Sequence, residues 1–137
     1  MRIRQNAGSF VLVPAMIHSF SSDLATEFGI SSAIVYSYVA HVAAKNKDSN
    51  QRAERYTGTI RDICTRIPYL SRNAIHEALT RLSAGTNAHE PVLQRIKPKH
   101  GHGVHYKVTQ KEYMTKNVHR FSTKVASEHG IVPAIVY

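Results

Sequence analysis

The stretch TIRDICTRIPYLSRNAIHEALTRL, residues 59–82, determines the fold that we predict for this chain. Its first half has apolar residues at helical spacing, and these are Ile60, Ile63, Cys64 and Ile67. Pro68 interrupts that pattern because proline cannot continue a helix interior, and Thr59 and Ser71 stand where N-cap residues are preferred. The second half offers another apolar side, formed by Ile75, Ala78, Leu79 and Leu82. We therefore predict two amphipathic helices joined by a tight turn.

A basic hairpin is predicted directly after these helices, in VLQRIKPKHGHGVHYKVT at residues 92–109. Apolar residues alternate along its two flanks, and they are Val92, Leu93 and Ile96 on one side and Val104, Tyr106 and Val108 on the other. The turn KPKHGHG contains glycines that permit a tight tip. Helices, turn and hairpin together predict an α+β fold that is mostly α: a winged helix-turn-helix with a β-hairpin wing.

Two extra N-terminal helices are predicted before this motif. The segment SSDLATEFG fits a short helix with Ser21 or Ser22 as its cap and Gly29 as its end. A second helix is predicted to start from a cap at Ser31 or Ser32 and to reach about residue 45. We expect a loop at 45–54, a short strand at 55–57, an N-terminal arm at 1–17 and a winged-helix domain at 18–112.

The chain then repeats part of itself. The segment HSFSSDLATEFGISSAIVY (18–36) matches HRFSTKVASEHGIVPAIVY (119–137), with eleven of nineteen positions identical at an offset of 101 residues. An offset of that size is the length of a small domain and is too long for a solenoid repeat. We therefore expect residues 113–137 to be a second module, begun and cut short. The alternative is an exchanged homodimer, in which residues 119–137 occupy the site of 18–36 on another subunit.

The charge of the chain points to a polyanionic partner. Eighteen Lys and Arg stand against nine Asp and Glu, which gives a net charge of +9, and nucleic acid is the commonest polyanion. No uninterrupted apolar stretch is long enough to span a bilayer, and the apolar part of the N-terminus is too short for a secretion signal. The single cysteine, Cys64, excludes an internal disulfide framework. We expect a cytoplasmic protein with no membrane partner.

Duplex DNA is the partner that the predicted motif fits. The second helix of the motif would enter the major groove, where Arg suits guanine edges and Asn suits adenine. The predicted base contacts are Ser71, Arg72, Asn73, His76 and Thr80. The predicted backbone contacts are Thr59, Arg61, Arg66, Arg81, Lys97, Lys99, His100, His102 and Lys107. The alternatives are a solvated helix face, and a hairpin whose lysines only prevent edge-to-edge aggregation.

No catalytic constellation, cofactor motif or metal site is predicted. His100, His102 and His105 lack a cysteine or acidic residue nearby, so they make a poor zinc site. Protonation of these histidines near phosphates is the better hypothesis, and it would strengthen DNA binding below neutral pH. The chain has no phosphate-cradling glycine loop with its lysine, no paired carboxylates at useful spacing and no glycine-flanked serine. We therefore expect a protein that is not an enzyme.

The spacing around the proline also carries a family resemblance. Ile60, Ile63 and Ile67 are followed by the run Pro68 to Ser71 and then by a helix with Ile75 and Leu79. With the upstream segment GISSAIVYSYVAH (29–41), this resembles the N-terminal winged helix of phage replisome-organiser and DnaD-like replication proteins, over residues 18–109. The resemblance implies a winged-helix fold and a role in replication.

Three functions are consistent with these observations. The first is sequence-specific double-stranded DNA binding by a phage- or plasmid-type replication or partition factor. The second is a transcriptional repressor on the same scaffold. The third is a winged helix that binds protein, in which the charge is incidental.

Overall fold

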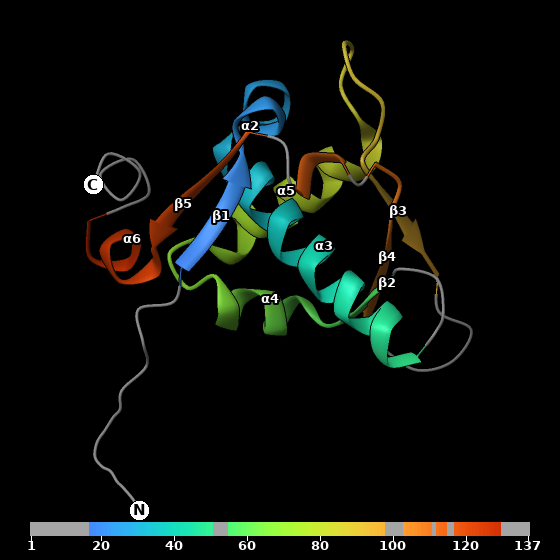
Figure 1. The fold of residues 1–137 in the computed structure, drawn as a ribbon, viewed down its shortest axis with the longest axis horizontal. Coiled ribbons are helices and arrows are strands. Elements are labelled where there is room, and N and C mark those ends of the chain that lie inside the picture. Colours follow the sequence, from blue (N-terminus) through green and yellow to red (C-terminus); the bar gives the residue numbers. More distant parts are fainter. Residues whose placement is uncertain (1–16, 51–54, 98–102, 111, 115–116, 130–137) are drawn as a thin grey trace, which may run out of the picture.

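The described part of the chain is α+β, with one long central helix and two small antiparallel sheets (Figure 1). The computed structural model of the 137-residue chain describes residues 17–50, 55–97, 103–110, 112–114 and 117–129. The elements are β1 (Ile17–Ser21), α2 (Ser22–Phe28), α3 (Ile30–Asn50), β2 (Arg55–Gly58), α4 (Ile60–Arg66), α5 (Arg72–Ala84), β3 (Leu93–Ile96), β4 (Val104–Val108), the 3-10 turn η1 (Glu112–Met114), β5 (Val118–Ser122) and α6 (Thr123–His129).

Helix α3 forms the centre of the core. Its fully or almost fully buried side chains are Ala33, Ile34, Val35, Tyr36, Val39, Ala40 and Ala43. These positions cover more than one side of the helix, so α3 contacts α5, α2, β1 and β2 at once. The buried side of α5 consists of Ile75, Ala78, Leu79 and Leu82, as the sequence predicts. The packing of α5 on α3 therefore fixes which side of α5 faces solvent.

The three-stranded sheet has the order β2-β4-β3, and its strands are antiparallel. Strand β4 places Tyr106 opposite both Tyr56 of β2 and Arg95 of β3. Tyr56 and Tyr106 are 1% and 4% exposed, so their side of the sheet lies against the core. The predicted hairpin flanks are confirmed as β3 and β4, and Val92 and Leu93 are fully buried.

Strands β1 and β5 form the second sheet, and each strand belongs to one copy of the sequence repeat. They lie side by side at the edge of the molecule opposite the β3–β4 hairpin (Figure 1). The short helices α2 and α6 follow the two strands directly. Residues 118–129 therefore contact the first copy of the repeat through a strand ladder.

The predicted helix caps of α2, α4 and α5 are confirmed. The Ser21 hydroxyl accepts a hydrogen bond from the Leu24 amide, and Gly29 ends α2 with a φ of 94°. Helix α5 begins after Ser71, whose hydroxyl accepts from the Ala74 amide at 3.1 Å, and it ends at Gly85. Each cap satisfies a helix-end group that lacks a partner within the helix.

The predicted start and end of the second helix were wrong. Helix α3 begins at Ile30, directly after Gly29, and the Gly29 carbonyl accepts from the Ala33 amide at 3.0 Å. No serine cap is used, because a single glycine both ends α2 and accepts the first hydrogen bond of α3. The helix also continues to Asn50, through a polar stretch that we expected to be a loop from residue 45. The polar residues 45–50 lack the apolar period on which the prediction relied.

The base of the β3–β4 hairpin depends on a close approach of two glycines. Gly103 has a φ of 103°, and a Cβ added there would lie 2.4 Å from the Gly58 carbonyl oxygen at the end of β2. We expect Gly103→Ala to lower the free energy of unfolding by about 1–3 kcal/mol, because it adds both a backbone strain and a clash. Urea unfolding measures the change, with Lys107→Ala, an exposed residue of β4, as the control. Equal stabilities of the two variants would contradict this packing.

Candidate nucleic-acid interface

The α4–α5 pair is held in place at both of its starting points. Thr59 and Asp62 form a reciprocal capping box at the start of α4, with both hydrogen bonds at 3.0 Å. Helix α4 ends at Arg66, two residues before Pro68, and the Leu70 amide donates to the Ile67 carbonyl at 3.2 Å within the turn. Ser71 then caps α5. The turn is therefore a defined structure, and it fixes the orientation of α5 relative to α4.

Tyr69 anchors this turn to the β1–β5 sheet. Its hydroxyl is hydrogen bonded to His18 Nδ1 at 2.6 Å, and its ring meets the Phe121 ring edge-on at 5.7 Å. Burial raises the pKa of Tyr69, so its hydroxyl keeps its proton. Burial, and to a lesser extent the Arg66 charge, lowers the pKa of His18 below its usual value of 6.5. The contact thus joins two neutral side chains at pH 7.

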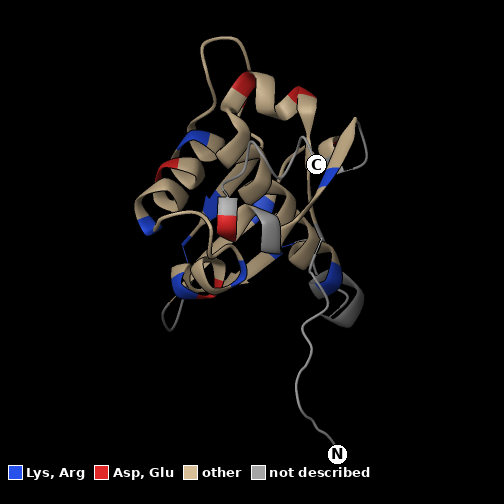
Figure 2. Ribbon diagram, turned by 90° about the vertical axis from the view of Figure 1, so that its left-hand side faces the viewer, with Lys and Arg blue, Asp and Glu red and all other residues tan. Residues whose placement is uncertain are grey.

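The side of α5 that faces away from the core is exposed and polar. We call it the α5 outer face, and its residues are Arg72, Asn73, His76, Glu77 and Thr80. All of the base contacts predicted on α5 lie on this face, and Ser71 is exposed at its N-terminal end. Glu77 is acidic and lies among them, so the face has a mixed charge. Figure 2 marks Lys and Arg positions on both α4 and α5, with acidic positions between them.

Several predicted contact residues also have roles within the protein. The hydroxyls of Thr59 and Ser71 accept cap hydrogen bonds, which leaves their protons available for a phosphate oxygen. The Thr80 hydroxyl donates to the His76 carbonyl at 2.9 Å, so it can only accept from a base. Arg81 turns toward α2, where its Nη1 donates to the Phe28 carbonyl at 3.5 Å. A phosphate contact of Arg81 would compete with that bond.

The outward side of the three-stranded sheet carries cations close to the hairpin. Lys107 of β4 lies directly between Arg55 of β2 and Gln94 of β3, and all three side chains are exposed. Lys97 is exposed just beyond the end of β3, and His105 is partly buried on β4. The predicted contacts Lys99, His100 and His102 lie outside the described residues. Arg61 and Arg66 are exposed on α4.

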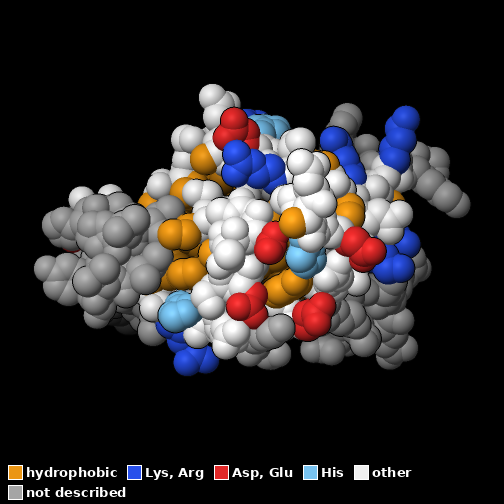
Figure 3. Space-filling view, turned by 90° about the horizontal axis from the view of Figure 1, so that it is seen from above, with side chains coloured by type: hydrophobic (Ala, Val, Ile, Leu, Met, Phe, Trp, Pro, Cys, Tyr) orange, Lys and Arg blue, Asp and Glu red, His pale blue; other side chains and the backbone are white. Residues whose placement is uncertain are grey.

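Acidic side chains gather on a different side of the molecule. Asp23, Glu27 and Glu112 lie close enough to Tyr113 to raise its pKa, in addition to the effect of burial. The view from above shows several acidic side chains on this surface (Figure 3). Helix α4 lies at the opposite side of the molecule (Figure 1). Asp23, Glu27 and Glu112 therefore lie away from α4, on a side of the molecule that also carries Lys and Arg side chains (Figure 3).

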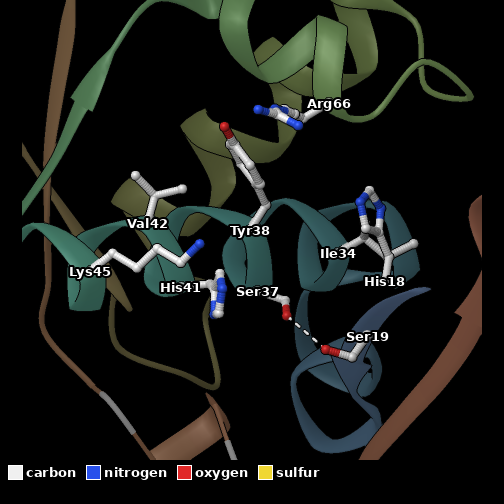
Figure 4. Close-up of a pocket in the computed structure, with 9 residues that line it drawn as sticks. All are labelled: His18, Ser19, Ile34, Ser37, Tyr38, His41, Val42, Lys45 and Arg66. Atoms are coloured by element: carbon white, nitrogen blue, oxygen red, sulfur yellow. Dashed lines mark hydrogen bonds between the residues drawn. The ribbon is translucent and has the colours of Figure 1, made fainter. Parts of the chain in front are cut away.

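A cleft between α3, β1 and α4 was not predicted from the sequence (Figure 4). It is lined by His18, Ser19, Ile34, Ser37, Tyr38, His41, Val42, Lys45 and Arg66. The lining contains the cations Lys45 and Arg66 and no carboxylate, and the Ser19 and Ser37 hydroxyls are hydrogen bonded at 3.2 Å. The spacing of Ser37, His41 and Lys45, four residues apart on one helix, was the available signal. It could not show that Arg66 and His18 complete the cleft.

The described residues provide neither a group of metal ligands nor a membrane-spanning helix. They contain no group of three or more His, Cys, Asp or Glu side chains placed to hold a metal ion. Among the helices that the structure describes, none has an apolar run that could span a lipid bilayer. Comparison of the chain with protein-family models, curated proteins and solved structures found no match.

The half-buried His18 makes the stability of this region depend on pH. Because its pKa is lower in the folded chain than in the unfolded chain, the unfolded chain binds the proton first as the pH falls through about 6.5. We expect the free energy of unfolding to fall from about pH 7 to pH 5, and less steeply in His18→Gln, which has no titrating ring. Urea unfolding at a series of pH values measures the difference. Identical slopes for the two proteins would show that His18 titrates normally.

Proposed function

We propose that this protein binds double-stranded DNA through a winged helix formed by α3 to β4. Three features support the proposal: the order of helices and strands, the sheet order β2-β4-β3, and a basic hairpin after the α4–α5 pair. The observation that carries it is the exposure of the whole α5 outer face on a capped helix whose other side is buried. A helix of this kind can enter a major groove without any rearrangement of the core.

Sequence reading is assigned to the first two turns of α5. Arg72 would bind a guanine edge and Asn73 an adenine edge, each through two hydrogen bonds. His76, one turn later, and Thr80 would extend the contact along the groove. Glu77 stands beside them and accepts but cannot donate, so it suits the amino group of cytosine and repels a phosphate. The mixed charge of the α5 outer face therefore favours base edges over nonspecific backbone contact.

The hairpin and α4 supply the attraction to the DNA backbone. Lys97 and Lys107 are exposed, and within the described residues neither is ion-paired to a carboxylate. Arg61 and Arg66 of α4 are exposed as well. Lysine contacts of this kind position the protein without reading sequence, and their counterion release makes affinity depend on salt. In this arrangement α5 gives specificity and the surrounding cations give affinity.

The biological role that we favour is a replication or partition factor of phage or plasmid type. It rests on the resemblance of residues 18–109 to phage replisome-organiser and DnaD-like proteins. A transcriptional repressor is the second candidate, because the same scaffold and the same α5 outer face would serve it equally well. A footprint on DNA from the neighbourhood of the gene separates the two: repeated origin-like sites support the first, and a promoter operator supports the second.

Loss of Asn73 should weaken sequence preference. After selection of bound genomic fragments gives a preferred site, we expect Asn73→Ala to lose about 1–3 kcal/mol of discrimination at one base pair. Binding to unrelated DNA should change little, because that binding depends on phosphate contacts. Competition binding with sites that differ at single base pairs measures the effect. An unaltered preference in both Asn73→Ala and Arg72→Ala would contradict the assignment of α5 as the reading helix.

Loss of Lys107 should act on all DNA sequences alike. We expect Lys107→Ala to reduce affinity uniformly and to lower the slope of log K against log salt by about one. The matched control is Arg120→Ala, which removes an exposed cation of β5 on the opposite edge of the molecule and should leave the slope unchanged (Figure 1). Titrations between about 50 and 200 mM salt measure both slopes. If wild-type binding were independent of salt, the protein-binding alternative would replace DNA binding.

A further inference from the structure

The two copies of the sequence repeat begin with the same local structure. Strand β1 and helix α2 span residues 17–28, and β5 and α6 span residues 118–129. Every boundary is shifted by the same 101 positions that separate the repeats in the sequence. The strands read IHSFS and VHRFS, so three of their five residues are identical. Strand β5 is therefore a second β1 that lies against the first.

The register of the β1–β5 ladder has two-fold symmetry. Ser19 lies opposite Arg120, which is its own counterpart in the repeat. On either side of this pair, His18 lies opposite Phe121, and Phe20 lies opposite His119. Each histidine thus faces the phenylalanine of the other copy. A local two-fold axis passes between Ser19 and Arg120, as in an interface between two identical subunits.

Both His–Phe pairs of the ladder are in contact, but their ring geometries differ. The Phe20 and His119 rings stack with centroids 5.6 Å apart, and the His18 and Phe121 rings meet edge-on at 6.1 Å. The two phenylalanines also contact each other at 6.2 Å. Phe20 is 5% exposed and Phe121 is 4% exposed, so each strand supplies one aromatic ring that is almost fully covered. Each strand of the ladder thus brings a histidine and a phenylalanine to the other in the same spacing.

We propose that the edge of β1 that pairs with β5 is a self-complementary docking surface for β1 of a second copy of this chain. Strand β5 occupies this edge as an internal copy of that partner. A second β1 carries the same histidine and phenylalanine at the same spacing. In the same register, His18 of one chain faces Phe20 of the other, and the two Ser19 residues meet at the axis. Serine is small enough for this position, and its hydroxyl keeps its partner in the Ser37 hydroxyl of its own chain.

Charge selects β1 rather than β5 as the self-pairing strand. In a pair of two β5 strands, Arg120 would face Arg120 of the other chain at the axis, and like charges directly opposite each other are destabilising. The β1–β5 pair instead places Arg120 against Ser19. Strand β5 can therefore cover β1, but it does not offer a second self-complementary edge. While β5 is in place, the docking surface is occupied and the chain stays monomeric.

The test removes β5 from the ladder and leaves β1 intact. Phe121→Asp places a charge at an almost fully buried position, so β5 leaves, whereas Phe121→Leu keeps an apolar side chain there. We expect wild type and Phe121→Leu to sediment as the 15.3 kDa monomer over a range of concentrations. Phe121→Asp should approach twice that mass as its concentration rises. Circular dichroism reports whether each variant is folded, and Phe121→Ser replaces Phe121→Asp if the latter is not.

A second substitution tests whether β1 forms the interface. In the Phe121→Asp protein, Ser19→Arg would set two arginines against each other at the axis and should restore the monomer, whereas Ser19→Thr should keep the dimer. In the Phe121→Asp protein that also carries Cys64→Ala, Ser19→Cys should form a disulfide-linked dimer, because directly opposite residues have the Cα spacing that a disulfide requires. Thr57→Cys, on the exposed side of β2, is the control and should not.

Two results would overturn the proposal. One is a folded Phe121→Asp or Phe121→Ser protein that stays monomeric at every concentration and gives no Ser19→Cys disulfide. The other is a dimer that persists with Ser19→Arg, or a wild-type dimer, either of which would place the interface elsewhere. Under the proposed function, a two-fold dimer would read inverted half-sites. That consequence rests on DNA binding, but the mass measurement uses no DNA, so the two proposals can fail independently.

Discussion

The packing of α5 against α3 is the constraint on which the other features depend. Four apolar side chains of α5 are buried, and burial of each of the three larger ones, Ile75, Leu79 and Leu82, contributes about 1.5–3 kcal/mol. With that side fixed inward, helical periodicity leaves the α5 outer face in solvent. The caps at Ser71 and Gly85 then set the two ends of α5. The α5 outer face is thus exposed because the opposite side of α5 is buried in the core.

The α4–α5 pair could be predicted from the sequence because the residues that define its helix ends lie close to those ends along the chain. Thr59, Pro68, Ser71 and Gly85 act within a few positions of the helix ends they define, and the apolar spacing of Ile75 and Leu79 decides which side is buried. The start of α3 was predicted wrongly for a related reason. Ser31 and Ser32 are good caps by residue type, but Gly29 already supplies the first acceptor of the helix. Both Gly29 and the two serines could begin a helix, and α3 begins directly after Gly29, the earlier of these positions.

Features that join distant segments could not be predicted in this way. The repeat was visible in the sequence, but nothing in it stated that its two strands would pair, or in which register. The cleft likewise needs β1, α3 and α4 together, and only the α3 part has a spacing signal. The role of Arg81 was missed because its partner, the Phe28 carbonyl, belongs to another helix. Every residue has a backbone carbonyl, so the sequence does not show which carbonyl will accept a side-chain hydrogen bond.

The anchoring of Tyr69 by Phe121 has a consequence for the order of folding. Proteins generally fold from the N-terminus as they leave the ribosome, and α4 and α5 emerge well before β5. The turn between these helices therefore forms first without its last aromatic neighbour, while Phe20 and Tyr69 keep surface that β5 later covers. A nascent chain on a crowded polysome would pass through a stage in which neighbouring chains compete with its own C-terminal strand. If β1 of a second chain docks on this edge as proposed, the timing of translation, as well as the final energy, would influence which strand pairs with β1.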